Sequence, residues 1–235
     1  MKTRRLFYED VYIQEFEAIV LSCEEKDGKY HVILNATAFY PEGGGQPADK
    51  GMIDNIPVVD VQYIDGELCH IMESPLEEGA QVIGKIDWNW RFDLMQQHSG
   101  EHIVSGMIHE KYGYENVGFH MGEEIITIDL SGMLTWQQVQ EIEKKVNYYI
   151  WMNQQVNIFY PDERQRKFIP YRSKKELTGE IRLVEFPGAD LCACCGLHVT
   201  HASQIGLVKI LSCKKFRDGV RMEMLSGKRA LDYLS

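Results

Sequence analysis

The spacing of apolar residues changes once along this 235-residue chain, near Asp87, and the change limits what the chain can fold into. Before it, short apolar runs alternate with turns that contain Gly or Asp, at 12–23, 30–35, 56–64, 68–73 and 81–87. Such runs are typical of strands in a small barrel or sandwich. After it, residues 89–111 contain no proline and carry apolar residues at helical spacing. The sequence therefore predicts a change from β-structure to a long helix.

The rest of the chain is expected to mix strands and helices. A strand is expected over 123–130, and Thr135 and Gln138 have the spacing of a capping box that starts a helix ending near Met152. Further strands are expected over 181–186, 205–216 and 219–225, the last two paired as a hairpin. We therefore predict two domains, a β-domain over 1–88 that contains a glycine-rich motif and an α+β domain over 89–235.

The charge balance is unfavourable for binding nucleic acid, which requires positive charge. The chain carries 25 basic and 35 acidic side chains, which gives a net charge of −10. The acidic excess is uneven, because residues 161–235 contain 14 basic and 9 acidic side chains. Two interpretations remain open: this last third presents a positive face, or its basic side chains are scattered over the surface.

The amino-terminal sequence does not resemble a signal peptide. Glu9 and Asp10 lie where a signal peptide has its apolar core, and no apolar run in the sequence reaches the length of a membrane span. We therefore expect a cytoplasmic protein with no membrane partner. The six cysteines are then expected to be thiols or metal ligands, because the cytosol is reducing.

Two short motifs could together hold a metal ion. His98 and His102 are four residues apart on the expected helix, so their side chains project from one face. Cys194 and His198 lie close together beside Gly196, in a stretch that also contains two further cysteines. Each pair alone is a weak signal, but together they form a mixed nitrogen and sulfur set that suits tetrahedral Zn²⁺.

A third motif is the glycine-rich segment 38–51. Three consecutive glycines, Gly43 to Gly45, follow an expected strand and precede Gln46 and Asp49. The segment lacks the Lys-Ser/Thr end of a phosphate-binding loop, which disfavours a nucleotide hydrolase. Without further context, it would be interpreted as a flexible hairpin loop.

The motifs, in this order, are similar to those of a known family. The segments FYPEGGGQPADKG, HSGEH, CCGLHV, IGLVKI and GVRMEML resemble the AlaX family of trans-acting alanyl-tRNA editing proteins, relatives of the editing domain of alanyl-tRNA synthetase. The resemblance implies a small amino-terminal β-barrel followed by an α+β editing domain like that shared by threonyl- and alanyl-tRNA synthetases. It also implies an aminoacyl-tRNA deacylase that uses Zn²⁺ to hydrolyse serine or glycine wrongly esterified to tRNA(Ala).

The resemblance also implies roles for individual residues. The expected zinc ligands are His98, His102, Cys194 and His198. The residues expected to help build the substrate pocket are Gly43, Gly44, Gly45 and Gln46. Cys195 and Leu197 depart from the Cys-Gly-Gly-Thr-His pattern of the synthetase, and Cys192 adds a thiol. Either extra cysteine could therefore replace Cys194 as the ligand.

Other polar residues are candidates for catalysis and for tRNA binding. A pocket that selects serine needs a hydrogen bond to its hydroxyl group, and the catalytic candidates are Gln46, Glu101, His120 and Thr127. The tRNA-binding candidates flank the last hairpin: Lys214, Lys215, Arg217 and Arg221. Four protein ligands resemble a closed structural site, so zinc could be catalytic or could orient the substrate.

A different class of function fits the same residues. A non-catalytic zinc-binding protein that associates with tRNA or senses redox state would also use a closed ligand set and extra thiols. Turnover distinguishes the two functions, because only the hydrolase releases an amino acid. The sequence determines neither the oligomeric state nor the preference between serine and glycine.

Overall fold

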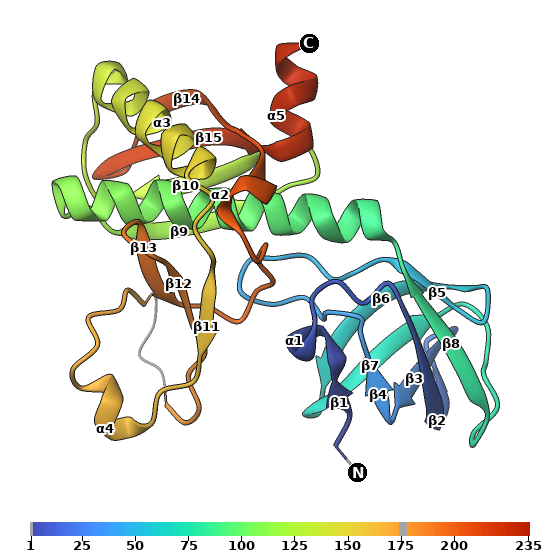
Figure 1. Ribbon diagram of the computed structural model, residues 1–235. Coiled ribbons are helices and arrows are strands. Elements are labelled where there is room, and N and C mark those ends of the chain that lie inside the picture. The colour runs from blue at the N-terminus through green and yellow to red at the C-terminus, as the bar shows by residue number, and fades with distance from the viewer. Residues whose placement is uncertain (1, 174–177) are drawn as a thin grey trace. The chain divides into compact units, whose positions relative to one another are not determined.

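The computed structural model describes residues 2–173 and 178–235. These form two compact units, Met1–Leu94 and Met95–Ser235, which we describe separately (Figure 1). The division falls within α2 (Trp88–Tyr112), the long helix expected over 89–111.

Six strands of the first unit hydrogen-bond in the order β2-β3-β7-β6-β5-β8 and close on themselves as a barrel with antiparallel neighbours. They are β2 (Glu15–Lys26), β3 (Lys29–Leu34), β5 (Gly51–Ile53), β6 (Ile56–Ile64), β7 (Glu67–Met72) and β8 (Gln81–Ile86). Three short elements accompany them: β1 (Arg4–Arg5), α1 (Leu6–Glu9) and β4 (Ala36–Thr37). The amino-terminal part is therefore predominantly β-structure, as predicted.

Alternation along the strands builds the core of this unit. In β8, Val82, Gly84 and Ile86 are buried while the residues between them are exposed. A Cβ atom at Gly84 would lie 2.3 Å from the ring of Phe16 on the neighbouring strand. Glycine at this position therefore makes room for the aromatic ring in the core.

A buried ion pair fixes the segment that contains the glycine-rich motif. Arg91, in the first turn of α2, donates to both carboxylate oxygens of Asp49, and neither side chain is exposed. The guanidinium also donates to the carbonyl oxygens of Val11 at 3.0 Å and Ala38 at 2.5 Å. Residues 38–49 are thus held at both ends by one side chain.

The glycine-rich motif is a tight hairpin within the first unit. Gly43 and Gln46 exchange two backbone hydrogen bonds of 3.0 Å, and the residues between them, Gly44 and Gly45, have φ values of 62° and 82°. Two consecutive positive φ values are typical of a type I′ turn, which explains the need for glycine. The motif is therefore a defined turn, and the Gln46 side chain that follows it is fully buried.

The second unit contains two antiparallel sheets and the helices that pack on them. The four-stranded sheet has the order β14-β15-β10-β9, and the three-stranded sheet has the order β11-β12-β13. The strands are β9 (Asn116–Met121), β10 (Ile126–Leu130), β11 (Asn157–Phe159), β12 (Leu183–Phe186), β13 (Asp190–Ala193), β14 (Val208–Phe216) and β15 (Gly219–Ser226). The helices after α2 are α3 (Trp136–Trp151), α4 (Glu163–Arg166), the 3₁₀ helix η1 (Ala202–Ile205) and α5 (Gly227–Leu234).

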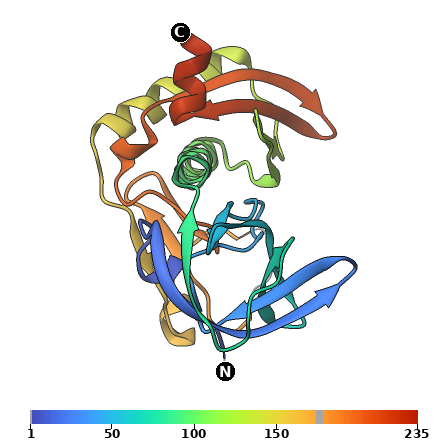
Figure 2. The same ribbon diagram turned by 90° about the vertical axis from the view of Figure 1, so that its right-hand side faces the viewer.

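Helix α2 is the central element of the second unit, as the view along its axis shows (Figure 2). Every residue from 95 to 108 is buried, so the helix is covered on all its faces. Small residues allow this close packing: a Cβ atom at Gly100 would lie 2.1 Å from Ser226 Oγ, and one at Gly106 would lie 2.3 Å from the Ala189 carbonyl oxygen.

Most elements expected from the sequence are confirmed in the second unit. Thr135 and Gln138 form the predicted capping box, and β14 and β15 form the predicted hairpin. The strand expected over 123–130 begins only at Ile126, because the Gly122 amide donates to the Ile125 carbonyl and closes a turn there. Strands β9, β11 and β13 were not predicted.

Candidate metal centre

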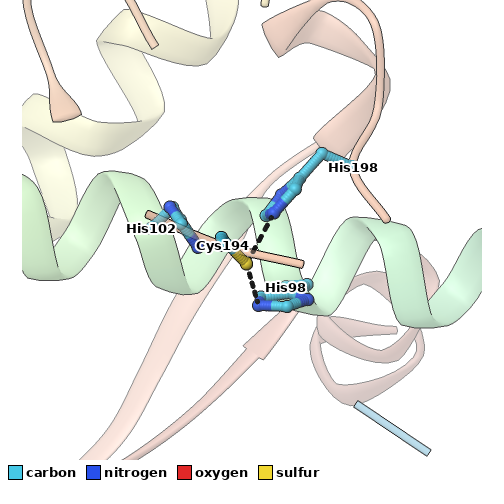
Figure 3. A group of neighbouring side chains, drawn as sticks. All are labelled: His98, His102, Cys194 and His198. Carbon is cyan, nitrogen blue, oxygen red and sulfur yellow. Dashed lines mark hydrogen bonds between the residues drawn. The ribbon is translucent and has the colours of Figure 1, made fainter. Parts of the chain in front are cut away.

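The four predicted metal ligands converge in the second unit. His98 and His102 project from α2 one turn apart, and Cys194 and His198 come from the segment that follows β13 (Figure 3). One donor atom from each residue lies within 4.8 Å of the other three. Cys194 Sγ is 3.5 Å from Nε2 of His98 and 3.5 Å from Nε2 of His198. This group could therefore hold a metal ion.

Cys194 is the cysteine of this group, although the sequence left three choices. Cys195 is exposed, and Cys192 belongs to a second buried group, which contains Asp190 and shares His102 with the first. The Gly196 amide donates to Cys194 Sγ at 3.3 Å, which favours a thiolate. Burial raises the pKa of the Cys192 thiol, so this side chain stays protonated.

The pKa values of the clustered groups reflect their mutual contact. Burial opposes ionisation of the Cys194 thiol, but His98 and His102 lower its pKa well below the ordinary value. Burial also acts against protonation of His102, yet Cys194 and Asp190 raise the pKa of this imidazole to about 10. The thiol and the imidazole thus stabilise each other's charged form, which makes a thiolate available to a metal.

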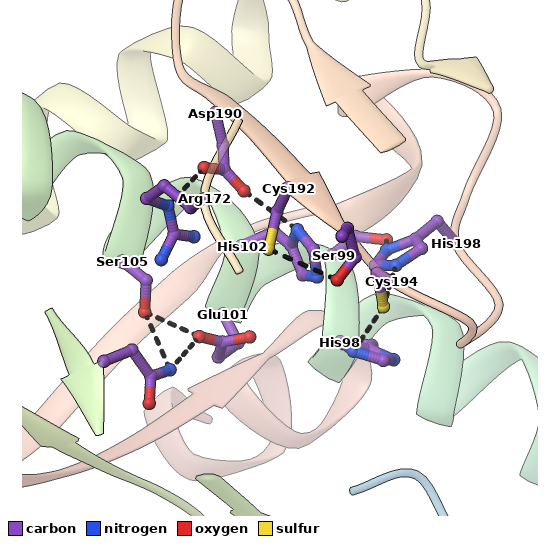
Figure 4. A network of polar contacts seen from close by, with 12 residues as sticks. His98, Ser99, Glu101, His102, Ser105, Arg172, Asp190, Cys192, Cys194 and His198 are labelled. Atoms are coloured by element: carbon purple, nitrogen blue, oxygen red, sulfur yellow. Dashed lines mark hydrogen bonds and ion pairs between the residues drawn. The ribbon is translucent and has the colours of Figure 1, made fainter. Parts of the chain in front are cut away.

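Two of the candidate ligand histidines are oriented by bonds to their other ring nitrogens (Figure 4). His102 Nδ1 is 2.9 Å from Asp190 Oδ2, and His198 Nδ1 is 3.2 Å from Ser99 Oγ. Because Nδ1 is engaged in this way, Nε2 of each ring is directed to the cluster. The sequence did not single out Ser99 or Asp190, since both are remote in sequence from the histidines that they contact.

Glu101, a catalytic candidate, lies in a different buried network. Its Oε1 atom accepts a hydrogen bond from Ser105 Oγ at 2.6 Å (Figure 4). It also accepts one from Asn116 Nδ2 at 2.5 Å. Glu101 precedes His102 on the helix and is only 2% exposed. These contacts join α2 to β9, which gives the carboxylate a structural role in the fold.

Aromatic residues that the sequence did not single out flank the cluster. The ring of Phe119, on β9, stacks on His98 with the centroids 5.4 Å apart, and Phe186, on β12, contacts both His102 and His198. His120 and Thr127 are opposite one another in β9 and β10. Because neighbouring residues in a strand point to opposite faces, His120 points away from the face on which Phe119 contacts His98.

The structure distinguishes among the four tRNA-binding candidates on the β14–β15 hairpin. Arg221 binds both carboxylate oxygens of Asp129, at 2.6 and 2.7 Å, and its guanidinium lies 3.8 Å from the centroid of Phe216. Lys214, Lys215 and Arg217 are exposed. Arg221 is therefore occupied in an ion pair, and the other three are better placed to contact phosphate.

In residues 2–173 and 178–235, no helix has the length and apolar composition needed to cross a membrane.

Two family profiles match the chain. The profile described as "tRNA synthetases class II (A)" matches residues 5–90. The profile described as "Threonyl and Alanyl tRNA synthetase second additional domain" matches residues 181–221, the segment that contains Cys194 and His198.

Individual proteins match over nearly the whole chain. The alanyl-tRNA editing protein Aarsd1-B of Xenopus laevis is 35% identical over 96% of this chain and 59% of its own length. The alanyl-tRNA editing protein AlaX-L of Pyrococcus horikoshii is 32% identical over 98% of this chain and 60% of its own length. The alanine–tRNA ligase of Ignicoccus hospitalis is 35% identical over 98% of this chain and 26% of its own length. The chain thus spans about 60% of the length of these editing proteins, and the matches show that it is related to the AlaX family of alanyl-tRNA editing proteins.

Proposed function

We propose that this chain is a zinc-dependent trans-editing hydrolase that removes serine or glycine wrongly esterified to tRNA(Ala). The convergence of His98, His102, Cys194 and His198 is the observation that carries the proposal. It occurs in a chain related to alanyl-tRNA editing proteins, and two of the four residues lie in the segment that matches the domain of threonyl- and alanyl-tRNA synthetases.

The donor geometry fits zinc. In a tetrahedral site with Zn–S of about 2.3 Å and Zn–N of about 2.0 Å, sulfur and nitrogen ligands lie about 3.5 Å apart. Both distances from Cys194 Sγ to imidazole nitrogens are 3.5 Å. A ligand set of three imidazoles and one thiolate also favours zinc over harder cations. His98, His102, Cys194 and His198 would therefore hold the ion.

The residues around the cluster would orient the ester and limit its contact with water. An aminoacyl ester is already activated, so a hydrolase has to position water and stabilise the developing negative charge. Zinc, when bound, supplies a Lewis acid for this purpose. The three histidines are buried and Cys194 is only partly buried, so the substrate is expected to approach from the side of Cys194. The Phe119 ring, which stacks on His98, adds an apolar surface to the cluster.

Selection of serine over alanine requires a polar partner in the pocket. A pocket distinguishes serine strongly from alanine only if it offers a hydrogen bond to the serine hydroxyl group. When alanine binds in such a pocket, the buried polar partner stays unpaired. In line with the resemblance, we assign substrate binding to the hairpin formed by Gly43, Gly44, Gly45 and Gln46. We assign phosphate contacts to Lys214, Lys215 and Arg217, which are exposed on the β14–β15 hairpin.

The test is hydrolysis of seryl-tRNA(Ala) by the purified, zinc-loaded chain. We expect release of serine by the wild type and by Lys26→Ala, a change at an exposed ion pair with Glu24 in the first unit. We expect no release by His102→Ala, because this substitution removes a ligand of the cluster. Turnover by His102→Ala at the wild-type rate would refute the proposed role of the metal centre.

A non-catalytic zinc-binding function is the second candidate. The observation in its favour is that four protein donors fill a tetrahedral site, whereas catalytic zinc usually keeps one position open. In that case the zinc-loaded chain would bind tRNA without releasing an amino acid. The hydrolysis assay therefore distinguishes the two functions directly.

A further inference from the structure

We propose that Asp190 is a positioning residue for the metal ligand His102 and that Arg172 holds Asp190 in place. The proposal rests on the metal-binding role given above to His102. It assigns a role in metal binding to two side chains that belong to none of the sequence motifs. The contacts join His102 on α2, Asp190 on β13 and Arg172, which follows α4 (Figure 4).

The contact between Asp190 and His102 fixes the imidazole ring. His102 Nδ1 is 2.9 Å from Asp190 Oδ2, and the two side chains are 4% and 1% exposed. A hydrogen bond from Nδ1 to a carboxylate keeps a proton on Nδ1. Nε2, the nitrogen that faces Cys194 and the other ligands, is therefore the one that gives up its proton and offers a lone pair when a metal binds. Without this bond, the ring could rotate or carry its proton on Nε2, and the metal would lose a preorganised ligand.

Strand β13 brings the carboxylate and the thiolate to the same helix. Asp190 is the first residue of β13, and Cys194 directly follows its last residue. The close approach of this strand to α2 depends on Gly106, because a Cβ atom there would lie 2.5 Å from Asp190 Cβ. The backbone thus places Asp190 and Cys194 on either side of His102, each able to engage one ring nitrogen.

Arg172 orients the carboxylate. Its Nε atom donates to Asp190 Oδ1 at 2.7 Å, which leaves Oδ2 for His102. The Arg172 backbone runs beside β13: its amide donates to the Leu191 carbonyl at 2.8 Å, and its carbonyl accepts from the Ala193 amide at 2.9 Å. The guanidinium is therefore anchored on the same strand as the residue that it orients.

Arg172 also excludes an alternative interpretation of these residues. His102, Asp190 and Cys192 lie close enough together to form a second metal-binding group. The Asp190 carboxylate is already shared between a guanidinium and an imidazole, and a cation added there would be repelled by Arg172. Asp190 thus acts through His102 and does not bind a metal itself.

The test is the zinc dissociation constant of the full chain, measured by competition with a chromophoric chelator. Asp190→Ala should weaken zinc binding roughly 10- to 100-fold, as is typical when a carboxylate partner of a ligand histidine is removed. Asp190→Asn should bind zinc more tightly than Asp190→Ala, because the amide oxygen can still accept from Nδ1. The matched control is Asp129→Ala, which breaks another Arg–Asp pair of the same unit and should leave the constant unchanged.

A double-mutant cycle separates positioning from a general structural role. In a His102→Ala background, Asp190→Ala should cause no further loss of zinc affinity, because the residue through which it acts is absent. An equal loss in both backgrounds, or a wild-type constant for Asp190→Ala, would overturn the proposal. The measurement uses no tRNA, so a chain that binds zinc in this manner but fails to release serine would refute the proposed function alone.

Discussion

The buried ion pair between Arg91 and Asp49 allows a sharp prediction about stability. Replacing Arg91 by Met should destabilise the first unit by about 3 to 5 kcal/mol, the usual effect of removing one partner of a buried pair. Both side chains are 0% exposed, so the remaining Asp49 carboxylate has no access to water. The carbonyl oxygens of Val11 and Ala38 also lose their donor.

An exposed ion pair of the same barrel provides the control. Lys85 and Glu15 are 3.1 Å apart, but their side chains are 58% and 59% exposed. Exposed pairs contribute about 0 to 1 kcal/mol, so Lys85→Met should change the free energy of unfolding by no more than that. The difference between the two substitutions therefore reports burial of the charge and not the loss of an ion pair as such.

The assay is equilibrium unfolding in urea, followed by tryptophan fluorescence and by circular dichroism. Trp88 and Trp90 lie in the first turn of α2, beside the substituted residue, and report on this region. Each single variant, Arg91→Met or Asp49→Leu, leaves a buried charge without its partner, whereas the double variant leaves none. The double variant should therefore lose less free energy than the two single variants together. If Arg91→Met costs no more than Lys85→Met, the reasoning from burial is wrong.

Three further predictions concern the metal, the pH response and tRNA. The purified chain should contain about one zinc ion, and His98→Ala or Cys194→Ala should lose it; full zinc content in both variants would contradict the assignment of the ligands. Burial lowers the pKa of His70 to about 4. Since the unfolded chain then binds the proton first, stability should fall by up to about 3 kcal/mol between pH 6.5 and pH 4. His70→Gln should lack this change in urea titrations, and parallel pH profiles would contradict it. Binding of tRNA should weaken as salt is added. Replacing Lys214, Lys215 and Arg217 by Glu should raise KM without altering the zinc content, and an unchanged KM would place the binding face elsewhere.

The sequence was most informative where short-range spacing determines structure. The four-residue separation of His98 and His102 within one helix indicated that both side chains lie on one face, and the short stretch 192–198 indicated a histidine close to a cysteine, although it left three cysteines to choose from. The Thr135 capping box is equally local, and it is confirmed. Features of this kind depend on the geometry of one helix or turn and can therefore be read from neighbouring residues.

The contacts that orient the ligands could not be predicted in this way. Asp190 is 88 residues from His102 in sequence, and its contact depends on how β13 packs against α2 at Gly106. Phe119 lies on β9, a strand that the sequence did not reveal, so its stacking on His98 was not anticipated. The choice among three cysteines likewise required the end of β13 to be placed. Long-range packing determines these positions, and local propensity does not specify it.

Comparison of kcat/KM for seryl-tRNA(Ala) and alanyl-tRNA(Ala), with the same zinc-loaded preparation, tests the proposed editing function most directly. We expect serine to be released at least about tenfold more efficiently, equivalent to about 1.4 kcal/mol, because only serine offers a hydroxyl to a polar partner in the pocket. Equal hydrolysis of both esters, or hydrolysis of neither by protein that contains stoichiometric zinc, would contradict the editing function.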